Sequence, residues 1–258
     1  YIVVKESASN QEFKWVDTHC HLQLSKYKIS EIDFSNIEYL IIPGVDTKSS
    51  IKAREVCNSL PINGYWSAGL HPHDAKKMED EKETLEALFS EAQLIGETGL
   101  DYYRNLSSKE EQYKNLKFHL EASKQYKKPI ILHCRDSFED LYNLVEEYQG
   151  EFPIILHSWT GGKKWTKRYL DLDIYFSISG IVTYDTAKDL QLSVEEIPLE
   201  RLLLETDTPY LTPVPKRGED NQPGYVFYTA QKVADLKGVS LEELSSHTIT
   251  NTNTLLGI

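Results

Sequence analysis

Ile130-Ile131-Leu132 and Ile154-Ile155-Leu156 are two short runs of the sequence in which every residue is apolar. Parallel strands are covered by helices on both faces and are apolar throughout, whereas half-exposed strands alternate apolar and polar residues. Both runs therefore predict buried parallel strands. The surrounding sequence should then alternate between helices, with a period of about 3.6 residues, and further short strands.

This alternation extends over nearly the whole chain. Strands are predicted at 13–19, 39–45, 65–70, 94–100, 129–133, 152–157, 174–181 and 201–205. Helices are predicted at 48–59, 81–92, 109–127, 138–148, 163–171, 186–195, 225–237 and 241–253. Eight β/α units predict an α/β fold of the TIM (β/α)8 barrel class, with a doubly wound open sheet as the alternative. No linker divides the chain, so we expect one domain over 1–258, with 1–13 as an N-terminal extension.

The composition narrows the possible functions. The 28 Lys and Arg residues against 40 Asp and Glu give a net charge of −12, which excludes a protein that coats duplex DNA through charge alone. A nucleic-acid enzyme is still possible, because bound divalent cations supply positive charge locally. No run of about 18 apolar residues predicts a membrane span. Three cysteines without a C-x-x-C pair favour a reducing compartment, the cytoplasm, with the nucleus as an alternative.

Histidines and carboxylates recur at the C-terminal ends of the predicted strands. The set is His19, His21, Glu97, His133, His157 and Asp207. In a β/α barrel these strand ends converge on one mouth, where active sites are built. A single histidine there is best explained by an ordinary hydrogen bond, but packing does not require six metal-competent side chains. The set therefore predicts a metal centre.

His19 and His21 form an H-x-H pair, and side chains i and i+2 of a strand point to the same face. Mixed imidazole and carboxylate ligands suit Zn²⁺, Mn²⁺, Co²⁺ or Fe²⁺, and Mg²⁺ less well. Six ligands exceed what one tetrahedral Zn²⁺ needs, so we expect two divalent cations that share the catalytic carboxylate Glu97. Asp207 could bind metal and also take a proton from the attacking water.

Three further carboxylates and two further histidines have open or minor roles. Asp17, Asp101 and Glu205 either hydrogen-bond a histidine or a metal-bound water, or are buried structural carboxylates. His119 and His247 lie on predicted helices, and we expect them to be surface or packing residues.

Two residues near the predicted mouth are candidates for substrate contact. His71 is either part of a solvated loop or, as we favour, a substrate contact, whereas its neighbour His73 is expected to be solvated. Trp159 follows His157 closely and could stack on a nucleobase, although a packing role is equally compatible with the sequence.

Five motifs occur in order along the chain. They are Asp17-Thr18-His19-Cys20-His21, Gly69-Leu70-His71-Pro72-His73, Gly96-Glu97-Thr98-Gly99-Leu100-Asp101-Tyr102-Tyr103, His133-Cys134-Arg135-Asp136 and Glu205-Thr206-Asp207-Thr208-Pro209-Tyr210-Leu211. Together they resemble those of the TatD family of metal-dependent deoxyribonucleases, in the amidohydrolase superfamily. The resemblance runs from about Trp15 to Gly257 and implies a TIM barrel with two or three divalent cations.

The resemblance also implies a reaction and a substrate. TatD-like enzymes hydrolyse phosphodiester bonds, typically as 3′→5′ exonucleases on single-stranded DNA and sometimes on RNA. Carried over by motif, the metal ligands are the same six residues, and His71 and Arg135 contact the substrate phosphates. We expect a metal-bound hydroxide to attack phosphorus with Asp207 as the general base. We expect no membrane and no obligate protein partner.

One segment departs from the family pattern. Arg217-Gly218-Glu219-Asp220-Asn221-Gln222-Pro223 stands where the family shows Arg-Gly-Lys-Arg-Asn-x-Pro, so two basic positions are acidic. The change argues against a nucleic-acid contact at this rim. The alternatives are an amidohydrolase-type enzyme for a small amide, lactone or phosphoester, and a non-catalytic metal-binding protein. Many binuclear relatives bridge their metals with a modified lysine on the fourth strand, where this chain has Glu97, which favours the nuclease-like branch.

Overall fold

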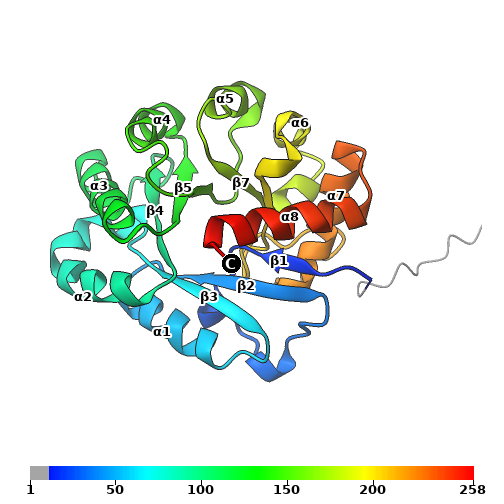
Figure 1. Ribbon diagram of the computed structural model, residues 1–258, viewed down its shortest axis with the longest axis horizontal. Coiled ribbons are helices and arrows are strands. Elements are labelled where there is room, and N and C mark those ends of the chain that lie inside the picture. Colours follow the sequence, from blue (N-terminus) through cyan, green and yellow to red (C-terminus); the bar gives the residue numbers. More distant parts are fainter. Residues whose placement is uncertain (1–11) are drawn as a thin grey trace, which may run out of the picture.

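The computed structural model describes residues 12–258, which form a parallel eight-stranded barrel ringed by helices (Figure 1). Each strand pairs in parallel with the next one along the chain. The strands are β1 Trp15–Asp17, β2 Ile37–Pro43, β3 Asn63–Ala68, β4 Leu94–Asp101, β5 Ile130–Arg135, β6 Ile154–Leu156, β7 Tyr175–Ile178 and β8 Leu202–Leu204. An isolated parallel bridge between Cys20 and Thr208 joins the extensions of β1 and β8. The TIM-barrel prediction is therefore confirmed, and the open sheet is excluded.

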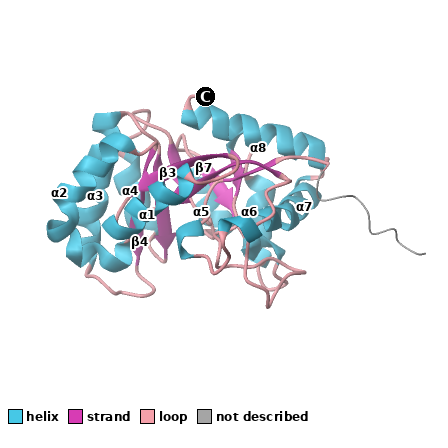
Figure 2. Cartoon of the chain, turned by 90° about the horizontal axis from the view of Figure 1, so that it is seen from below, coloured by secondary structure: helices cyan, strands magenta, loops and turns pink. Residues whose placement is uncertain are grey.

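The helices alternate with the strands and enclose the sheet (Figure 2). They are α1 Thr47–Asn58, α2 Met78–Glu91, α3 Lys109–Tyr126, α4 Phe138–Glu146, α5 Gly162–Tyr169, α6 Lys188–Glu196, α7 Val226–Lys237 and α8 Leu241–Leu256. No helix within 12–258 is both long and apolar enough to cross a membrane. Most of the predicted N-terminal extension, residues 1–11, lies outside the described part.

Several strands are shorter than predicted, and β1 matters most for the site. It ends at Asp17, so His19 and His21 lie on its extension and not within the strand. Backbone hydrogen bonds keep this extension aligned with its neighbours: Cys20 N–H donates to Ile41 O at 3.0 Å, and His21 N–H donates to Thr208 O at 2.7 Å. The two imidazoles therefore still face the same side.

The barrel interior and the helix-covered exterior are filled by alternate residues of the same strands. The interior cluster consists of Ile41, Leu94, Ile131, Ile155, Leu203 and Leu255. Leu255 belongs to α8, which lies across one end of the barrel in Figure 1 and closes it opposite the functional mouth. The neighbours of Ile131 in sequence, Ile130 and Leu132, pack outward against the helices. The apolar runs are thus buried on both faces, as predicted.

Asp17 closes the barrel between its first and last strands. Its carboxylate is fully buried and accepts hydrogen bonds from the backbone N–H and the hydroxyl of Thr206. Thr18 N–H donates to Leu204 O at 3.0 Å, and Asp207 N–H donates to His19 O at 2.8 Å. Burial raises the pKa of Asp17 to about 8. Of its two possible roles, Asp17 has the structural one, because within residues 12–258 its carboxylate oxygens accept from the backbone N–H of His19 and from Thr206 and from no imidazole nitrogen.

Helix α3 fixes the end of β3 through two buried polar side chains. Asn115 Nδ2 donates to Leu70 O at 2.7 Å, and Leu70 N–H donates to Nε2 of His119 at 3.1 Å. His119 Nδ1–H in turn donates to Asn115 O at 2.8 Å. His119 is therefore a fully buried packing residue that positions the segment leading to His71. His247 is only partly buried on α8.

Two glycines allow β3 and β5 to approach the backbone around Glu97. A Cβ on Gly69 would lie 2.3 Å from the carbonyl carbon of Gly96 and 2.7 Å from the Glu97 nitrogen. Gly96 has φ +112°, and a Cβ there would lie 2.5 Å from Ile131 O. The β4–β5 register is also irregular between Ile95 and Thr98, and such irregularities re-aim side chains. These features turn Glu97 into the barrel mouth.

The first prediction concerns His119. Burial lowers its pKa to about 4, below the ordinary value of 6.5, so the unfolded chain binds the extra proton between these values. Stability should therefore fall as the pH drops from about 6.5 towards 4. Between pH 7 and pH 5, the wild-type protein should lose about 2 kcal/mol more unfolding free energy than His119→Gln. Urea unfolding at both pH values measures this, and equal losses would contradict the assignment.

The second prediction concerns Gly69. In Gly69→Ala the new methyl group meets backbone atoms that cannot yield, and overpacking of this kind costs about 1–3 kcal/mol. Urea unfolding should show a loss in this range. Gly64→Ala is the matched control, because Gly64 lies on β3, which Gly69 directly follows, and its new methyl group first meets the flexible end of Leu60. Equal stability of the two variants would show that the contact with Gly96 is not a constraint.

Candidate metal centre

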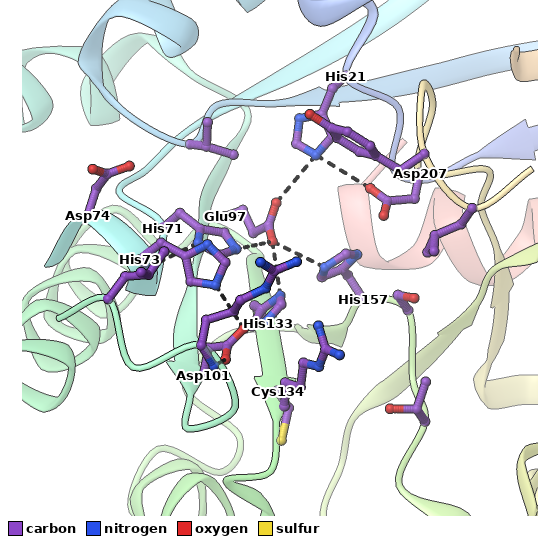
Figure 3. Close-up of a pocket in the computed structure, with 18 of the residues that line it drawn as sticks. His21, His71, His73, Asp74, Glu97, Asp101, His133, Cys134, His157 and Asp207 are labelled. Carbon is purple, nitrogen blue, oxygen red and sulfur yellow. Dashed lines mark hydrogen bonds and ion pairs between the residues drawn. The ribbon is translucent and has the colours of Figure 1, made fainter. Parts of the chain in front are cut away.

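A pocket of about 760 Å³ opens at the C-terminal ends of the strands (Figure 3). Five of the six predicted ligands line it, namely His21, Glu97, His133, His157 and Asp207. The sixth, His19, lies behind them and is 1% exposed. The structure therefore brings all six side chains together from β1, β4, β5, β6 and β8 or their extensions.

One oxygen of Glu97 faces the residues of the first and last strands. Glu97 Oε2 lies 3.1 Å from His19 Nε2 and 3.5 Å from His21 Nε2. Asp207 Oδ1 lies 3.6 and 3.5 Å from the same two nitrogens, which are 3.1 Å apart. Ligands about 2.0–2.1 Å from a tetrahedral ion are separated by about 3.4 Å. These five separations, 3.1–3.6 Å, are close to that value, and the ligand atoms of His19, His21 and Asp207 all lie within 4.8 Å of one another.

The other oxygen of Glu97 faces a second group of imidazoles. Glu97 Oε1 lies 3.1 Å from His157 Nε2, 3.3 Å from His133 Nδ1 and 3.2 Å from His71 Nε2. Figure 3 shows these rings pointing at the carboxylate from one side and His21 from the other. The contact with His71 was missed at the sequence level, where this residue was assigned to substrate. The carboxylate of Glu97 thus lies between two donor groups.

Hydrogen bonds on the far side of three imidazoles determine which nitrogen faces Glu97. His21 Nδ1 lies 3.2 Å from Pro43 O. His157 Nδ1 lies 3.1 Å from Glu205 Oε1, and His133 Nε2 lies 3.0 Å from Asp101 Oδ2. In each ring, an outward N–H leaves the inward nitrogen free to act as a ligand. Asp101 and Glu205 therefore have the first of their two possible roles.

The charges of the cluster fit a divalent cation. Burial opposes ionisation of Glu97, but the surrounding imidazoles, His157 foremost, outweigh burial and hold its pKa well below the usual range. Burial would lower the pKa of His21, yet its bonds to Asp207 and Glu97 raise that pKa to about 9. The buried, ionised carboxylates therefore need nearby positive charge. Either protons on the imidazoles or metal ions can supply it. The imidazole nitrogens suit Zn²⁺, Mn²⁺ or Co²⁺ better than Mg²⁺.

The residues expected to bind substrate differ in their placement. Arg135 is exposed and lines the pocket, with its guanidinium carbon 3.8 Å from the centroid of the Tyr103 ring. Trp159 is 2% exposed, and its Nε1–H donates to Thr166 Oγ1 at 2.8 Å. The prediction that Trp159 stacks on a base is therefore wrong, because α5 and β7 cover the indole.

Sequence reasoning also missed residues of the mouth. His73, expected to be solvated, is 31% exposed at the side chain and lies 2.9 Å from Asp101 Oδ2. Arg104 and the exposed Tyr210 line the pocket as well. All three follow strands, Arg104 and Tyr210 in loops and His73 in a short 3-10 helix, where strand periodicity gives no information on side-chain direction.

The chain is similar to known proteins over nearly its whole length. The TatD related DNase family matches the chain over residues 16–257. The chain is 34% identical over 252 residues to the uncharacterised metal-dependent hydrolase YabD of Bacillus subtilis, covering 94% of this chain and 98% of the relative. It is 35% identical over 248 residues to the uncharacterised metal-dependent hydrolase YcfH of Escherichia coli K12, covering 92% and 93%.

A solved structure agrees in fold. The TatD homologue YjjV of Escherichia coli K12 superposes with a TM-score of 0.87 at 23% identity, and the match covers 95% of this chain and 98% of that one. Since the family match leaves out only the ends of the chain and the relatives share a third of their residues with it, the chain belongs to the TatD-related DNase family of metal-dependent hydrolases.

Proposed function

We propose that this protein is a divalent-cation-dependent phosphodiesterase that shortens single-stranded DNA from its 3′ end and also accepts RNA. The observation that carries the proposal is the division of the Glu97 oxygens between two donor groups in one pocket. Two cations would be held by His19, His21 and Asp207 on one side and by His133 and His157 on the other, with Glu97 shared. When bound, such ions polarise phosphate oxygens and acidify water.

Asp207 is the residue that we assign to proton transfer. Its side chain is 13% exposed towards the pocket, against 3% for Glu97, so water and substrate can reach it. Asn221 holds the surrounding loop, because its Nδ2 donates to Thr206 O and to Tyr210 O on either side of Asp207. A carboxylate fixed in this way can accept the proton of the attacking water.

The walls of the pocket favour an anionic substrate. Arg104 and Arg135 line it, and neither forms an ion pair with a carboxylate within residues 12–258. Unpaired guanidinium groups bind phosphate strongly, and a neutral amide or lactone would leave them without a partner. Tyr210, 54% exposed, offers a ring on which a base can stack. We keep His71 as a phosphate contact, at the edge of the second donor group.

Glu219 and Asp220, the acidic residues of the segment that differs from the family pattern, do not oppose this proposal. Asp220 pairs with Lys26 at 3.2 Å, and Glu219 pairs with Lys216 at 3.5 Å. Neither carboxylate lines the pocket. Their charges are therefore balanced locally and do not face the place assigned to the phosphates. The free thiols of Cys20, Cys57 and Cys134 support a cytoplasmic site of action.

An assay on 5′-labelled single-stranded DNA tests the function. With Mn²⁺ or Zn²⁺, the wild-type protein should give a ladder of products shortened from the 3′ end, and EDTA should abolish it. Asp207→Asn should lower the rate about 100-fold or more, because a general base contributes that much. Asp220→Asn, the same change at a paired rim residue, should keep the wild-type rate.

Two results would contradict the proposal. The first is intact DNA with every metal, from protein shown to hold metal. The second is an Asp207→Asn variant that cleaves as fast as Asp220→Asn. Cleavage of p-nitrophenyl esters or amides in place of phosphodiesters would then indicate the amidohydrolase alternative.

A further inference from the structure

We propose that Asp101 is a positioning residue whose two carboxylate oxygens fix, at the same time, the cation-facing nitrogen of His133 and the loop that carries Arg104. The inference rests on the proposed function, since it concerns the same pocket. It adds the loop that carries Arg104 to the contact with His133 that Asp101 already makes.

The Oδ2 atom of Asp101 orients two imidazoles. His133 Nε2 lies 3.0 Å from this oxygen and His73 Nε2 lies 2.9 Å from it. An ionised carboxylate only accepts hydrogen bonds, so both rings turn an N–H towards Asp101. The second nitrogen of His133, Nδ1, then presents its lone pair on the other side of the ring. That nitrogen lies 3.3 Å from Glu97 Oε1.

The Oδ1 atom of Asp101 holds the backbone of the next loop. It accepts hydrogen bonds from the N–H groups of Tyr103, at 3.0 Å, and Arg104, at 2.8 Å. These bonds fix the start of the loop that follows β4. Arg104 lines the pocket directly, and the Tyr103 ring packs under the guanidinium of Arg135. Asp101 therefore supports both arginines of the pocket wall.

Asp101 is itself held firmly in place. Its side chain is 1% exposed. Gln112 of α3, fully buried, accepts from Asp101 N–H at 2.8 Å and donates to Asp101 O at 3.0 Å. The same amide of Gln112 donates to Ser107 O at 3.0 Å, near the end of the loop. The backbone of Asp101 is therefore held in place. Its carboxylate can then position the four groups that bind it, namely two imidazoles and two loop N–H groups.

The comparison with Glu205 shows what is particular to Asp101. Glu205 Oε1 receives the Nδ1–H of His157, but Glu205 Oε2 is buried without a hydrogen-bond partner. Within residues 12–258, Glu205 thus hydrogen-bonds one imidazole through one oxygen, while its second oxygen has no hydrogen-bond partner. Asp101 uses both oxygens and so links the cation side of the pocket to the side assigned to phosphate.

Because one oxygen of Asp101 binds the loop and the other binds the imidazoles, a substitution of the same shape can separate the two roles. In Asp101→Asn, the side-chain carbonyl is best placed against the two loop N–H donors, and the amide NH₂ then faces His133 and His73. His133 then accepts this hydrogen bond through Nε2. The neutral ring therefore carries its N–H on Nδ1, which faces Glu97. The loop stays held while the cation-facing nitrogen is lost. Asp101→Ala removes both functions.

Two measurements separate these effects. Zn²⁺ affinity is obtained by chelator competition, with the visible spectrum of the Co²⁺-loaded protein as a report on coordination. Amide hydrogen exchange of Tyr103 and Arg104 is followed in metal-free protein. In Asp101→Asn, the Zn²⁺ beside His133 and His157 should bind about 10–100-fold less tightly, with a changed Co²⁺ spectrum and near wild-type exchange. Asp101→Ala should show the same loss of affinity and faster exchange.

Asp140→Asn is the matched control. Asp140 is an exposed residue of α4 that accepts a hydrogen bond, at 2.7 Å, from Tyr102 of the same loop. The variant should leave both readouts unchanged. Wild-type Zn²⁺ affinity in Asp101→Asn, or wild-type exchange in Asp101→Ala, would overturn the inference. If Asp101→Ala does not fold, Asp101→Asn still decides it through the affinity. If the wild-type protein binds no cation, the proposed function fails, and the exchange data decide whether Asp101 holds the loop.

Discussion

The buried carboxylate of Asp17 joins the first strand of the barrel to the last one through both the backbone and the hydroxyl of Thr206. The site depends on this closure, because His19 and His21 follow β1 and Asp207 follows β8. In an open sheet these residues would lie at opposite edges, whereas here the His19 and Asp207 side chains come within 3.6 Å. The hydrogen bond from Asp207 N–H to His19 O, at 2.8 Å, continues the closure into the site itself.

Burial of charge is the second constraint. Glu97 is 3% exposed and stays ionised only because the imidazoles around it compensate for the lost hydration. Within residues 12–258, no lysine or arginine is buried among these carboxylates and imidazoles, so the compensating positive charge comes from imidazole protons or from a bound divalent cation. Three histidines also hydrogen-bond away from Glu97, to Pro43, Asp101 and Glu205. Each of these bonds leaves the other ring nitrogen free to bind a cation.

The sequence allowed prediction of the barrel and of the six residues that gather at its mouth, because each lies within a strand or at most four residues after one, where an apolar run fixes its place in the barrel. It did not allow prediction of what the loops do. Ser158 has φ +43°, and the chain turns there so that Trp159 N–H bonds to Ser177 O and the indole enters the core. Likewise, His71 and Asp101 meet their partners through contacts between neighbouring β/α units, which no local pattern encodes.

The central claim is that one carboxylate, Glu97, is shared by two divalent cations. The most direct test is a crystal structure of the Zn²⁺-loaded protein with anomalous data collected at the zinc absorption edge. We expect two anomalous peaks on opposite sides of the Glu97 carboxylate, one among His19, His21 and Asp207 and the other beside His133 and His157. A single peak, or zinc bound away from Glu97, would show that the carboxylate is not shared.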